Sequence, residues 1–112
     1  MATVTLLPYW KAKEGKLAEL KAACPSLVEL ISNEKKCTYI SFAFKEDTML
    51  VREGYEAAAG VLEHLEIAGP HFGPLNAAAD LVKLEVIASA EDVKALEEPL
   101  KGMNPIFYTV EF

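Results

Sequence analysis

The chain has 112 residues, of which 52% are hydrophobic, a formal net charge of -6 and a pI near 4.9. We expect one domain over residues 1–112, because two halves of this length would each bury too small a core. The acidic charge without a basic stripe argues against a nucleic-acid partner. No apolar run approaches the roughly 20 residues that a membrane helix needs, and the N-terminus lacks a signal peptide, so we expect a cytoplasmic protein.

The first quarter of the chain predicts a strand followed by a helix. Thr3 to Trp10 is a β-branched and aromatic run typical of a strand. Pro8 cannot donate to a sheet, so this strand should lie at an edge or contain a bulge. From about Glu14, apolar residues recur at helical spacing as far as Ile31. Pro25 interrupts this pattern and predicts a kink or two short helices.

A β-hairpin is expected next. The residues 34–36 form a charged loop, and Cys37 to Lys45 alternates as a half-buried strand does. The polar turn at residues 46–48 is too short for a crossover, which favours antiparallel pairing with the strand from Met49 to Tyr55.

The remaining elements alternate between helix and strand. An apolar helical stripe runs from Ala57 to Gly69, and residues 70–80 suggest a short helical piece and a linker. Leu81 to Ala88 predicts a strand with Val82, Leu84 and Val86 on one face. Ser89 has the features of an N-cap for a helix that ends near Pro99, and residues 106–112 form a last strand.

This order, β-α-β-β-α-β plus an additional α-β, predicts an α+β, ferredoxin-like fold with an antiparallel sheet. Both crossover helices should lie on one face of that sheet. The other face needs cover, and we expect a homodimer that pairs its sheet faces and leaves an internal pocket.

The candidate site lies between Thr48 and Leu75, where strand, helix, turn and ionisable side chains meet. Strand alternation puts Glu53 and Tyr55 on one face and Arg52 on the other. His64 borders the apolar stripe of the helix. His71 and Phe72 follow the Gly69-Pro70 breaker pair, so both histidines of the chain lie within this segment.

In these residues the chain resembles the antibiotic biosynthesis monooxygenase family of dimeric α/β barrels. The resemblance rests on Glu53-x-Tyr55, on a helix containing Leu62-Glu63-His64, and on the Pro-His-Phe close at residues 70–72. It implies a dimer with a small-molecule pocket and a cofactor-independent monooxygenase acting on a phenol-like or quinol-like ring. The haem-degrading branch is disfavoured, because the sole tryptophan, Trp10, ends the first strand.

The chemistry expected of these residues is proton transfer. His64 can act as a base near neutral pH, with Glu53 orienting it, and Tyr39, Tyr55, Arg52, His71 and Phe72 are the candidate substrate-binding residues. Each has a structural alternative: His64 could cap the apolar stripe, His71 could be a turn residue, and Arg52 could be solvated or paired with an acid such as Glu85. An isomerase using a His64/Glu53 proton shuttle and a non-catalytic ligand-binding or stress-related dimer remain alternatives.

No cofactor or metal is expected. Cys24 and Cys37 follow no metal or redox spacing and predict two free thiols. A zinc site would have to combine His64, His71 and a carboxylate.

Overall fold

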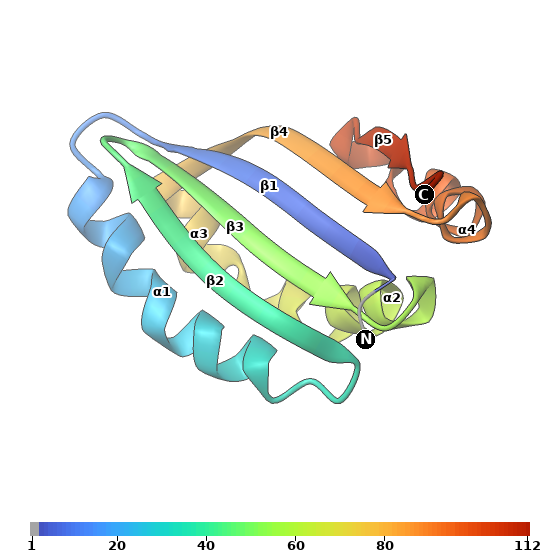
Figure 1. The fold of residues 1–112 in the computed structure, drawn as a ribbon. Coiled ribbons are helices and arrows are strands. Elements are labelled where there is room, and N and C mark those ends of the chain that lie inside the picture. Colours follow the sequence, from blue (N-terminus) through green and yellow to red (C-terminus); the bar gives the residue numbers. More distant parts are fainter. Residues whose placement is uncertain (1–2) are drawn as a thin grey trace.

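A computed structural model describes residues 3–112 of the chain, and Met1 and Ala2 lie outside the described residues. Strands and helices follow one another in the expected order, shown in Figure 1. The elements are β1 (Val4–Ala12), α1 (Leu17–Ser32), β2 (Cys37–Lys45), β3 (Thr48–Tyr55), α2 (Ala58–Ala68), η1 (Gly69–His71), α3 (Gly73–Ala78), β4 (Ala79–Ala88), α4 (Ala90–Leu100), η2 (Lys101–Met103) and β5 (Ile106–Thr109).

The sheet has the strand order β2-β3-β1-β4-β5, which confirms the α+β, ferredoxin-like fold. Neighbouring strands from β2 to β4 are antiparallel, whereas β5 pairs with β4 in parallel. The expectation of a wholly antiparallel sheet is therefore wrong at this edge. The reason is α4, a crossover helix that returns the chain to the sheet in the direction of β4.

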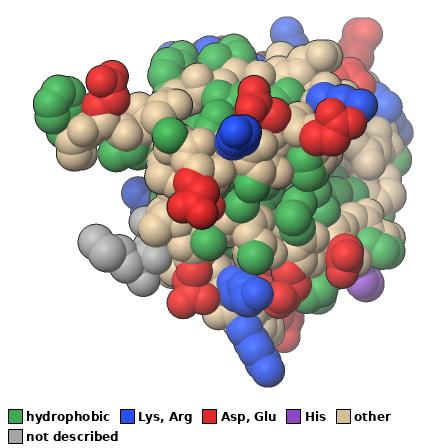
Figure 2. Space-filling model, turned by 90° about the vertical axis from the view of Figure 1, so that its right-hand side faces the viewer, with side chains coloured by type: hydrophobic (Ala, Val, Ile, Leu, Met, Phe, Trp, Pro, Cys, Tyr) green, Lys and Arg blue, Asp and Glu red, His purple; other side chains and the backbone are tan. Residues whose placement is uncertain are grey.

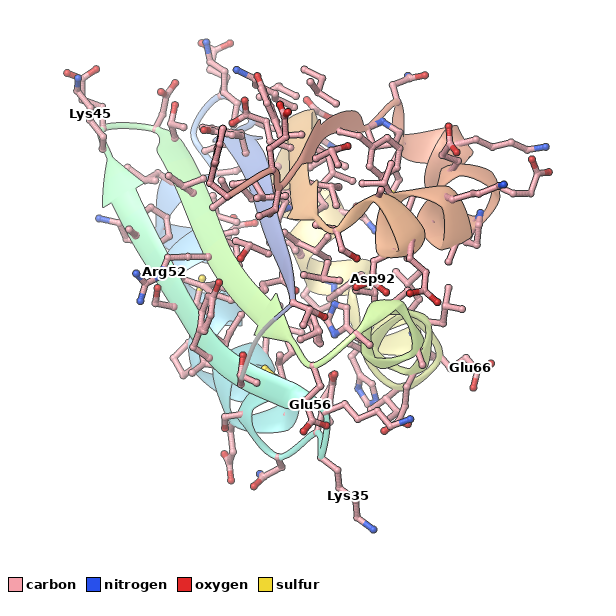
Figure 3. The ribbon with its side chains drawn as sticks, turned by 45° about the vertical axis from the view of Figure 1, so that its right-hand side comes forward. Lys35, Lys45, Arg52, Glu56, Glu66 and Asp92 are labelled. Carbon is pink, nitrogen blue, oxygen red and sulfur yellow. The ribbon has the colours of Figure 1, made fainter. Side chains whose placement is uncertain are left out.

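The helices α1, α2 and α3 cover one face of the sheet (Figure 1). The covered face of β3 carries Met49, Val51, Glu53 and Tyr55, all of which are buried as the alternation predicts. Arg52 points outward from the opposite face (Figure 3). Strand alternation thus selects which side chains reach the interior between sheet and helices.

Pro8 lies in the middle of the sheet, because β1 is the strand between β3 and β4. The expected edge position is therefore wrong, and a bulge lies next to Pro8 in the partner strand β4, where Val82 is the extra residue, and not in β1 itself. The β1–β3 pairing skips from Leu6 to Tyr9, and the β1–β4 register shifts between Tyr9 and Trp10. The shift also leaves Val82 58% exposed instead of sharing the buried face of Leu84, because a bulge reverses the alternation.

Pro25 is accommodated inside one continuous helix, α1, in place of two short ones. Leu20, Cys24, Leu27 and Ile31 form its buried side. Their packing against the sheet stabilises the helix enough to tolerate one missing backbone hydrogen bond.

Two groups of buried side chains form the interior, one under α1 and α3 and one under α2 and α4. Both cysteines are free thiols, as expected. None of the helices within residues 3–112 is long and apolar enough to cross a membrane.

Candidate functional site

A hydrogen-bonded pair on β3 forms the base of the site. Glu53 and Tyr55 leave the same face of the strand because they are two positions apart. The Tyr55 hydroxyl donates a hydrogen bond of 2.6 Å to Glu53 Oε1. Tyr55 is fully buried and Glu53 is only 6% exposed, so the pair is removed from bulk water.

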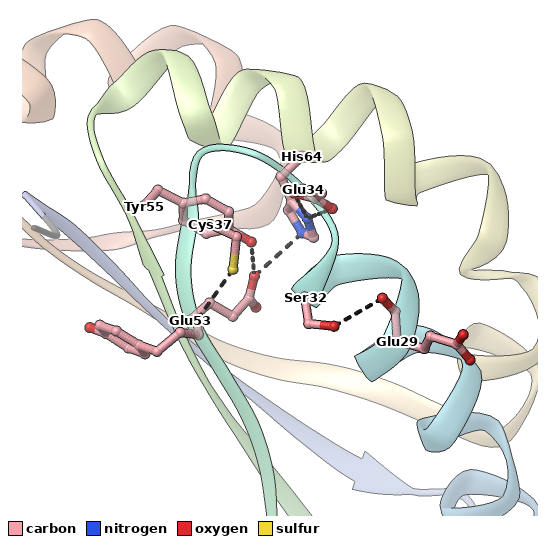
Figure 4. A network of polar contacts seen from close by, with 8 residues as sticks. Glu29, Ser32, Glu34, Cys37, Glu53, Tyr55 and His64 are labelled. Carbon is pink, nitrogen blue, oxygen red and sulfur yellow. Dashed lines mark hydrogen bonds and ion pairs between the residues drawn. The ribbon is translucent and has the colours of Figure 1, made fainter.

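The helix α2 brings His64 to this pair from above the sheet. The His64 Nε2 atom lies 3.4 Å from Glu53 Oε1, and the side chain is buried. The other ring nitrogen, Nδ1, lies 3.0 Å and 3.2 Å from the two carboxylate oxygens of Glu34. Figure 4 shows the resulting chain of polar contacts, in which the imidazole lies between two carboxyl groups.

Glu34 was not among the residues expected at the site. The charged loop expected at residues 34–36 is present between α1 and β2, but within it Glu34 is buried, with only 7% of the residue exposed. Its backbone N–H donates to Ile31 O at 3.0 Å, which continues the last turn of α1 and carries the side chain inward.

The environment changes the acidity of the pair on β3. Burial raises the pKa of Glu53 above its ordinary value of 4.5, against the opposing effects of His64 and of the Tyr55 hydrogen bond. Burial together with the neighbouring Glu53 carboxylate also raises the pKa of Tyr55, so the phenol keeps its proton and acts as a donor. Glu53 is therefore a carboxyl group that can hold a proton closer to neutral pH than an ordinary glutamate.

A cavity of about 70 Å³ adjoins Glu53 and His64. These two residues supply its polar wall, and the rest of the lining is apolar and comes from both core groups. The apolar lining residues are Leu6, Pro8, Trp10, Ile31, Phe42, Val51, Leu65, Phe72, Leu75, Leu81, Leu84, Leu100 and Met103.

The size of the cavity limits what fits without movement. A cavity that holds benzene in another protein measures about 150 Å³, roughly twice the volume of about 70 Å³ found here. A ring therefore enters only when lining side chains move. Leu65, Phe72 and Met103 are partly buried and lie at the margin of the core, so they are the side chains with room to do so.

Two atoms of the polar wall make no hydrogen bond to the described residues. Within residues 3–112, every fully buried side-chain nitrogen and oxygen has a hydrogen-bond partner. Tyr55 donates to Glu53 Oε1, and Glu53 Oε2 makes no hydrogen bond to the described residues. His64 Nε2 approaches Glu53 only at the 3.4 Å ion-pair distance. Both residues line the cavity, so Oε2 and Nε2 are the candidate atoms for contact with a ligand.

Of the expected substrate-binding residues, Phe72 lines the cavity, with its ring centroid 6.0 Å from that of His64. Tyr55 does not line the cavity and contacts the site through its hydrogen bond to Glu53. Tyr39 and Arg52 lie on the other side of the sheet, where the Arg52 guanidinium is 5.0 Å from the centre of the Tyr39 ring. This stacking, and not a pairing with Glu85, is the structural role of Arg52.

His71 is also away from the cavity. It is exposed on η1 and lines a separate surface depression beside α1 and Pro74. The two histidines therefore do not converge, and residues 3–112 contain no group of three His, Cys, Asp or Glu side chains placed to hold a metal ion. Glu34 and Glu53 contact opposite nitrogens of His64, which explains why this cluster is unsuitable.

Sequence reasoning missed Glu34 and Trp10 as site residues. Trp10 lines the cavity although it ends the expected first strand, because β1 runs on to Ala12 in the centre of the sheet. The signal for Trp10 was its alternation with Val4, Leu6 and Pro8. Glu34 has no periodic signal, because it lies in a turn.

No protein-family model matches the sequence, and a search of curated proteins finds no significant match. Several solved structures are similar. MupZ from Pseudomonas fluorescens is 31% identical, with a TM-score of 0.94, over 100% of this chain and 93% of that chain. SnoaB, a cofactor-independent oxygenase from Streptomyces nogalater, is 12% identical with a TM-score of 0.67, over 77% and 91% of the two chains.

A third similar structure is a conserved protein from Bacteroides thetaiotaomicron described as a possible oxidoreductase. It is 18% identical with a TM-score of 0.67, over 76% of this chain and 95% of that chain. At these lower identities, the likeness shows a shared fold that also occurs in an oxygenase.

Proposed function

The chain belongs to the same protein family as MupZ from Pseudomonas fluorescens, and we propose that it is an acid–base enzyme acting on a small, largely apolar metabolite. The observation that carries this proposal is the buried Glu53–His64 pair at the polar wall of an otherwise apolar cavity. Two titratable groups in one enclosed site, with a raised carboxyl pKa, are the arrangement that proton transfer requires.

The pair supports isomerisation of an enolisable substrate. Glu53 donates its proton from Oε2 to the substrate carbonyl oxygen while His64 Nε2 removes a proton from the adjacent carbon, which gives a neutral enol. When the substrate is a β,γ-unsaturated ketone, this enol is a conjugated dienol. Return of its hydroxyl proton to Glu53 and delivery of the His64 proton to the γ-carbon re-form the carbonyl and move the carbon–carbon double bond into conjugation with it. No net proton or electron is gained or lost.

The charges at the cavity favour this reaction over one that proceeds through an anionic form of the substrate. Glu34 and Glu53 both border His64, and the lining contains no lysine or arginine. An enolate or phenolate would therefore meet carboxyl groups without a fixed positive charge to stabilise it. A protonated Glu53 avoids that repulsion, because it transfers its proton to the substrate oxygen and the product is a neutral enol instead of an enolate.

Cofactor-independent monooxygenation is the second candidate, and it is supported by the fold shared with SnoaB. In this reaction His64 would take the proton of a phenol-like or quinol-like substrate, and dioxygen would oxidise the resulting anion. This second proposal also assigns the chain to the antibiotic biosynthesis monooxygenase family. Tyr39, Arg52 and His71 lie away from the cavity, so neither proposed reaction assigns them a step.

The test uses two readouts on a panel of enolisable ketones and quinols. Deuterium incorporation from D2O at the carbon beside a carbonyl, followed by NMR, detects proton abstraction even when the natural substrate is unidentified. Dioxygen consumption by an electrode detects oxygenation. We expect exchange without oxygen uptake, and oxygen uptake with quinols would select the second candidate.

Variants assign either activity to the site. His64→Gln and Glu53→Gln should each reduce the rate by about 10²–10⁴-fold, the usual contribution of one acid or base. His71→Gln is the matched control, since it makes the same change at the exposed histidine. A His64→Gln protein that retains the full rate would make the cluster structural and leave the non-catalytic ligand-binding dimer as the remaining function.

We also propose that the working form is a cytoplasmic homodimer paired through its sheet faces, without a metal or organic cofactor. The support for pairing is the face of the sheet that α1, α2 and α3 leave uncovered (Figure 1).

A further inference from the structure

We infer that Glu34 is a positioning residue, which keeps the His64 proton on Nδ1 and thereby leaves Nε2 as the basic atom that faces Glu53 and the cavity. The consequence for turnover rests on the proposed function. The consequence for the imidazole itself does not, and it can be measured separately.

The contact geometry fixes the direction of the hydrogen bond. Both oxygens of Glu34 lie within hydrogen-bonding distance of the same nitrogen, at 3.0 Å and 3.2 Å from His64 Nδ1. A carboxylate can only accept, so Nδ1 must carry the hydrogen. In the neutral ring the second nitrogen then has a free lone pair, and this nitrogen is Nε2, 3.4 Å from Glu53 Oε1.

The loop that carries Glu34 is anchored at both ends. The Cys37 N–H donates to Glu34 O at 3.2 Å, and the Glu56 N–H donates to Lys36 O at 3.0 Å. Lys36 also forms an ion pair of 3.7 Å with Glu63 on α2. A side chain held in this way loses little conformational freedom when it binds His64, which is what orientation of a catalytic imidazole requires.

Close approach of the loop to α2 depends on Gly60. A Cβ atom at this position would lie 3.0 Å from Lys36 Cβ and 3.2 Å from Tyr55 Cβ. A larger residue would press the loop away from the helix that carries His64. Gly60 therefore allows the loop to lie close enough to α2 for Glu34 to reach His64.

The surroundings of the imidazole explain why an acid is needed at this position. The ring is buried with Tyr55 and Phe72 as aromatic neighbours, at centroid distances of 5.3 Å and 6.0 Å. Cys37 adds no charge, because burial raises its pKa to about 11. When Nε2 accepts a proton, Glu34 supplies the negative charge that supports the imidazolium, and Glu53 is the group that exchanges protons.

The tautomer can be measured by NMR of protein labelled with ¹⁵N-histidine. The chain has only two histidines, and exposed His71 gives the reference spectrum of a solvated ring. We expect His64 to show a protonated Nδ1 and an unprotonated Nε2. A wild-type spectrum with the hydrogen on Nε2 would overturn the inference.

The variant Glu34→Gln tests the cause. Its amide offers both a donor and an acceptor, so we expect both His64 tautomers and a fall in kcat with little change in KM. The fall should be up to about 10⁴-fold, the scale of losing tautomer control in a hydrolase triad. Glu29→Gln removes the same charge from an exposed position on α1 and should change neither readout. An unchanged tautomer in Glu34→Gln would refute the positioning role.

Glu34→Asp keeps the negative charge and should retain the Nδ1–H tautomer. If Glu34→Gln is unstable, this variant shows whether the carboxylate sets the tautomer in a protein that still folds. Failure of the proposed function gives a different pattern. In that case His64→Gln would keep full activity while the wild-type spectrum still showed Nδ1–H.

Discussion

The Tyr55 hydroxyl donates at 2.6 Å to Glu53 Oε1, the same oxygen that lies 3.4 Å from His64 Nε2 at the wall of the cavity. Tyr55 remains a donor because its pKa is raised by burial and by the adjacent carboxylate. The tyrosine thus acts on the acidity of Glu53 through this hydrogen bond, which opposes the rise in the Glu53 pKa.

Replacing Tyr55 by Phe should move the pH dependence of the reaction. The Tyr55 hydrogen bond opposes the rise in the Glu53 pKa, so its loss raises that pKa further. The activity that requires protonated Glu53 should then persist to higher pH than in the wild type. Rates of deuterium exchange measured across the pH range report this shift.

The same variant should lower the free energy of unfolding by about 1–3 kcal/mol, because a buried acceptor loses its donor. Tyr9→Phe is the matched control, since Tyr9 OH donates to Glu85 at 2.7 Å away from the cavity. A Tyr55→Phe profile that superimposes on the wild type would show that Glu53 does not titrate in the reaction.

Glu53 should also make stability depend on pH. A carboxyl with a raised pKa binds more protons in the folded state than in the unfolded state, where its pKa is near 4.5. By linkage, stability falls as pH rises from about 4.5 to the folded pKa, and it is constant above that. Unfolding by denaturant at a series of pH values should show this fall.

Glu53→Gln should remove that part of the pH dependence. At neutral pH the variant should also have a higher free energy of unfolding than the wild type, because it buries a neutral amide instead of an ionisable carboxyl group. Glu29→Gln, at an exposed site, should reproduce the wild-type curve. Parallel curves for Glu53→Gln and the wild type would mean that Glu53 titrates normally.

The sequence predicted most of the fold because the elements have clear periods. The alternation in β2 and β3 placed both strands within a residue of their observed bounds, and Ser89 accepts from the Asp92 N–H as an N-cap should. The errors occurred at Pro8, Pro25 and Val82, where packing overrides a local rule. The central strand β1 keeps Pro8 beside a bulge in its neighbour β4, and packing of the buried face of α1 keeps Pro25 within the helix.

The site was only partly predictable. Glu53 and His64 could be paired from sequence because a strand and the following helix commonly face one another, and they lie 3.4 Å apart. Glu34 could not, because nothing local distinguishes a buried acid in a turn from a solvated one. Tyr39 and Arg52 were assigned by residue type, and they lie on the face of the sheet opposite the cavity.

Pro25→Ala should stabilise the protein. Proline in α1 removes the hydrogen bond that residue 25 would donate to Lys21 O, and Pro25 is exposed, so alanine adds no clash. We expect the free energy of unfolding to rise by about 1–3 kcal/mol, from the known penalty of proline inside a helix. Ser26→Ala, next to it and also exposed, should change it by less than about 0.5 kcal/mol. Equal effects of the two substitutions in thermal and denaturant unfolding would argue against this explanation.

The uncovered sheet face should pair with a second copy of the chain. Exposed apolar side chains on β4 and β5 include Ile87 and Tyr108, at 37% and 51% exposure. At the end of the molecule that carries α2, α4 and β5, Figure 2 shows apolar side chains gathered among charged ones. Apolar surface of this kind is usually buried against a partner. We therefore expect a dimer in analytical ultracentrifugation of the wild type.

Ile87→Lys should shift that dimer toward monomer, because it places a charge in the pairing face. Ile67→Lys is the control, since Ile67 has nearly the same exposure, 39%, but lies on α2. It should leave the sedimentation unchanged. A monomeric wild type, or equal dissociation by both substitutions, would refute pairing through the sheet, and the cavity chemistry would then have to operate within a single chain.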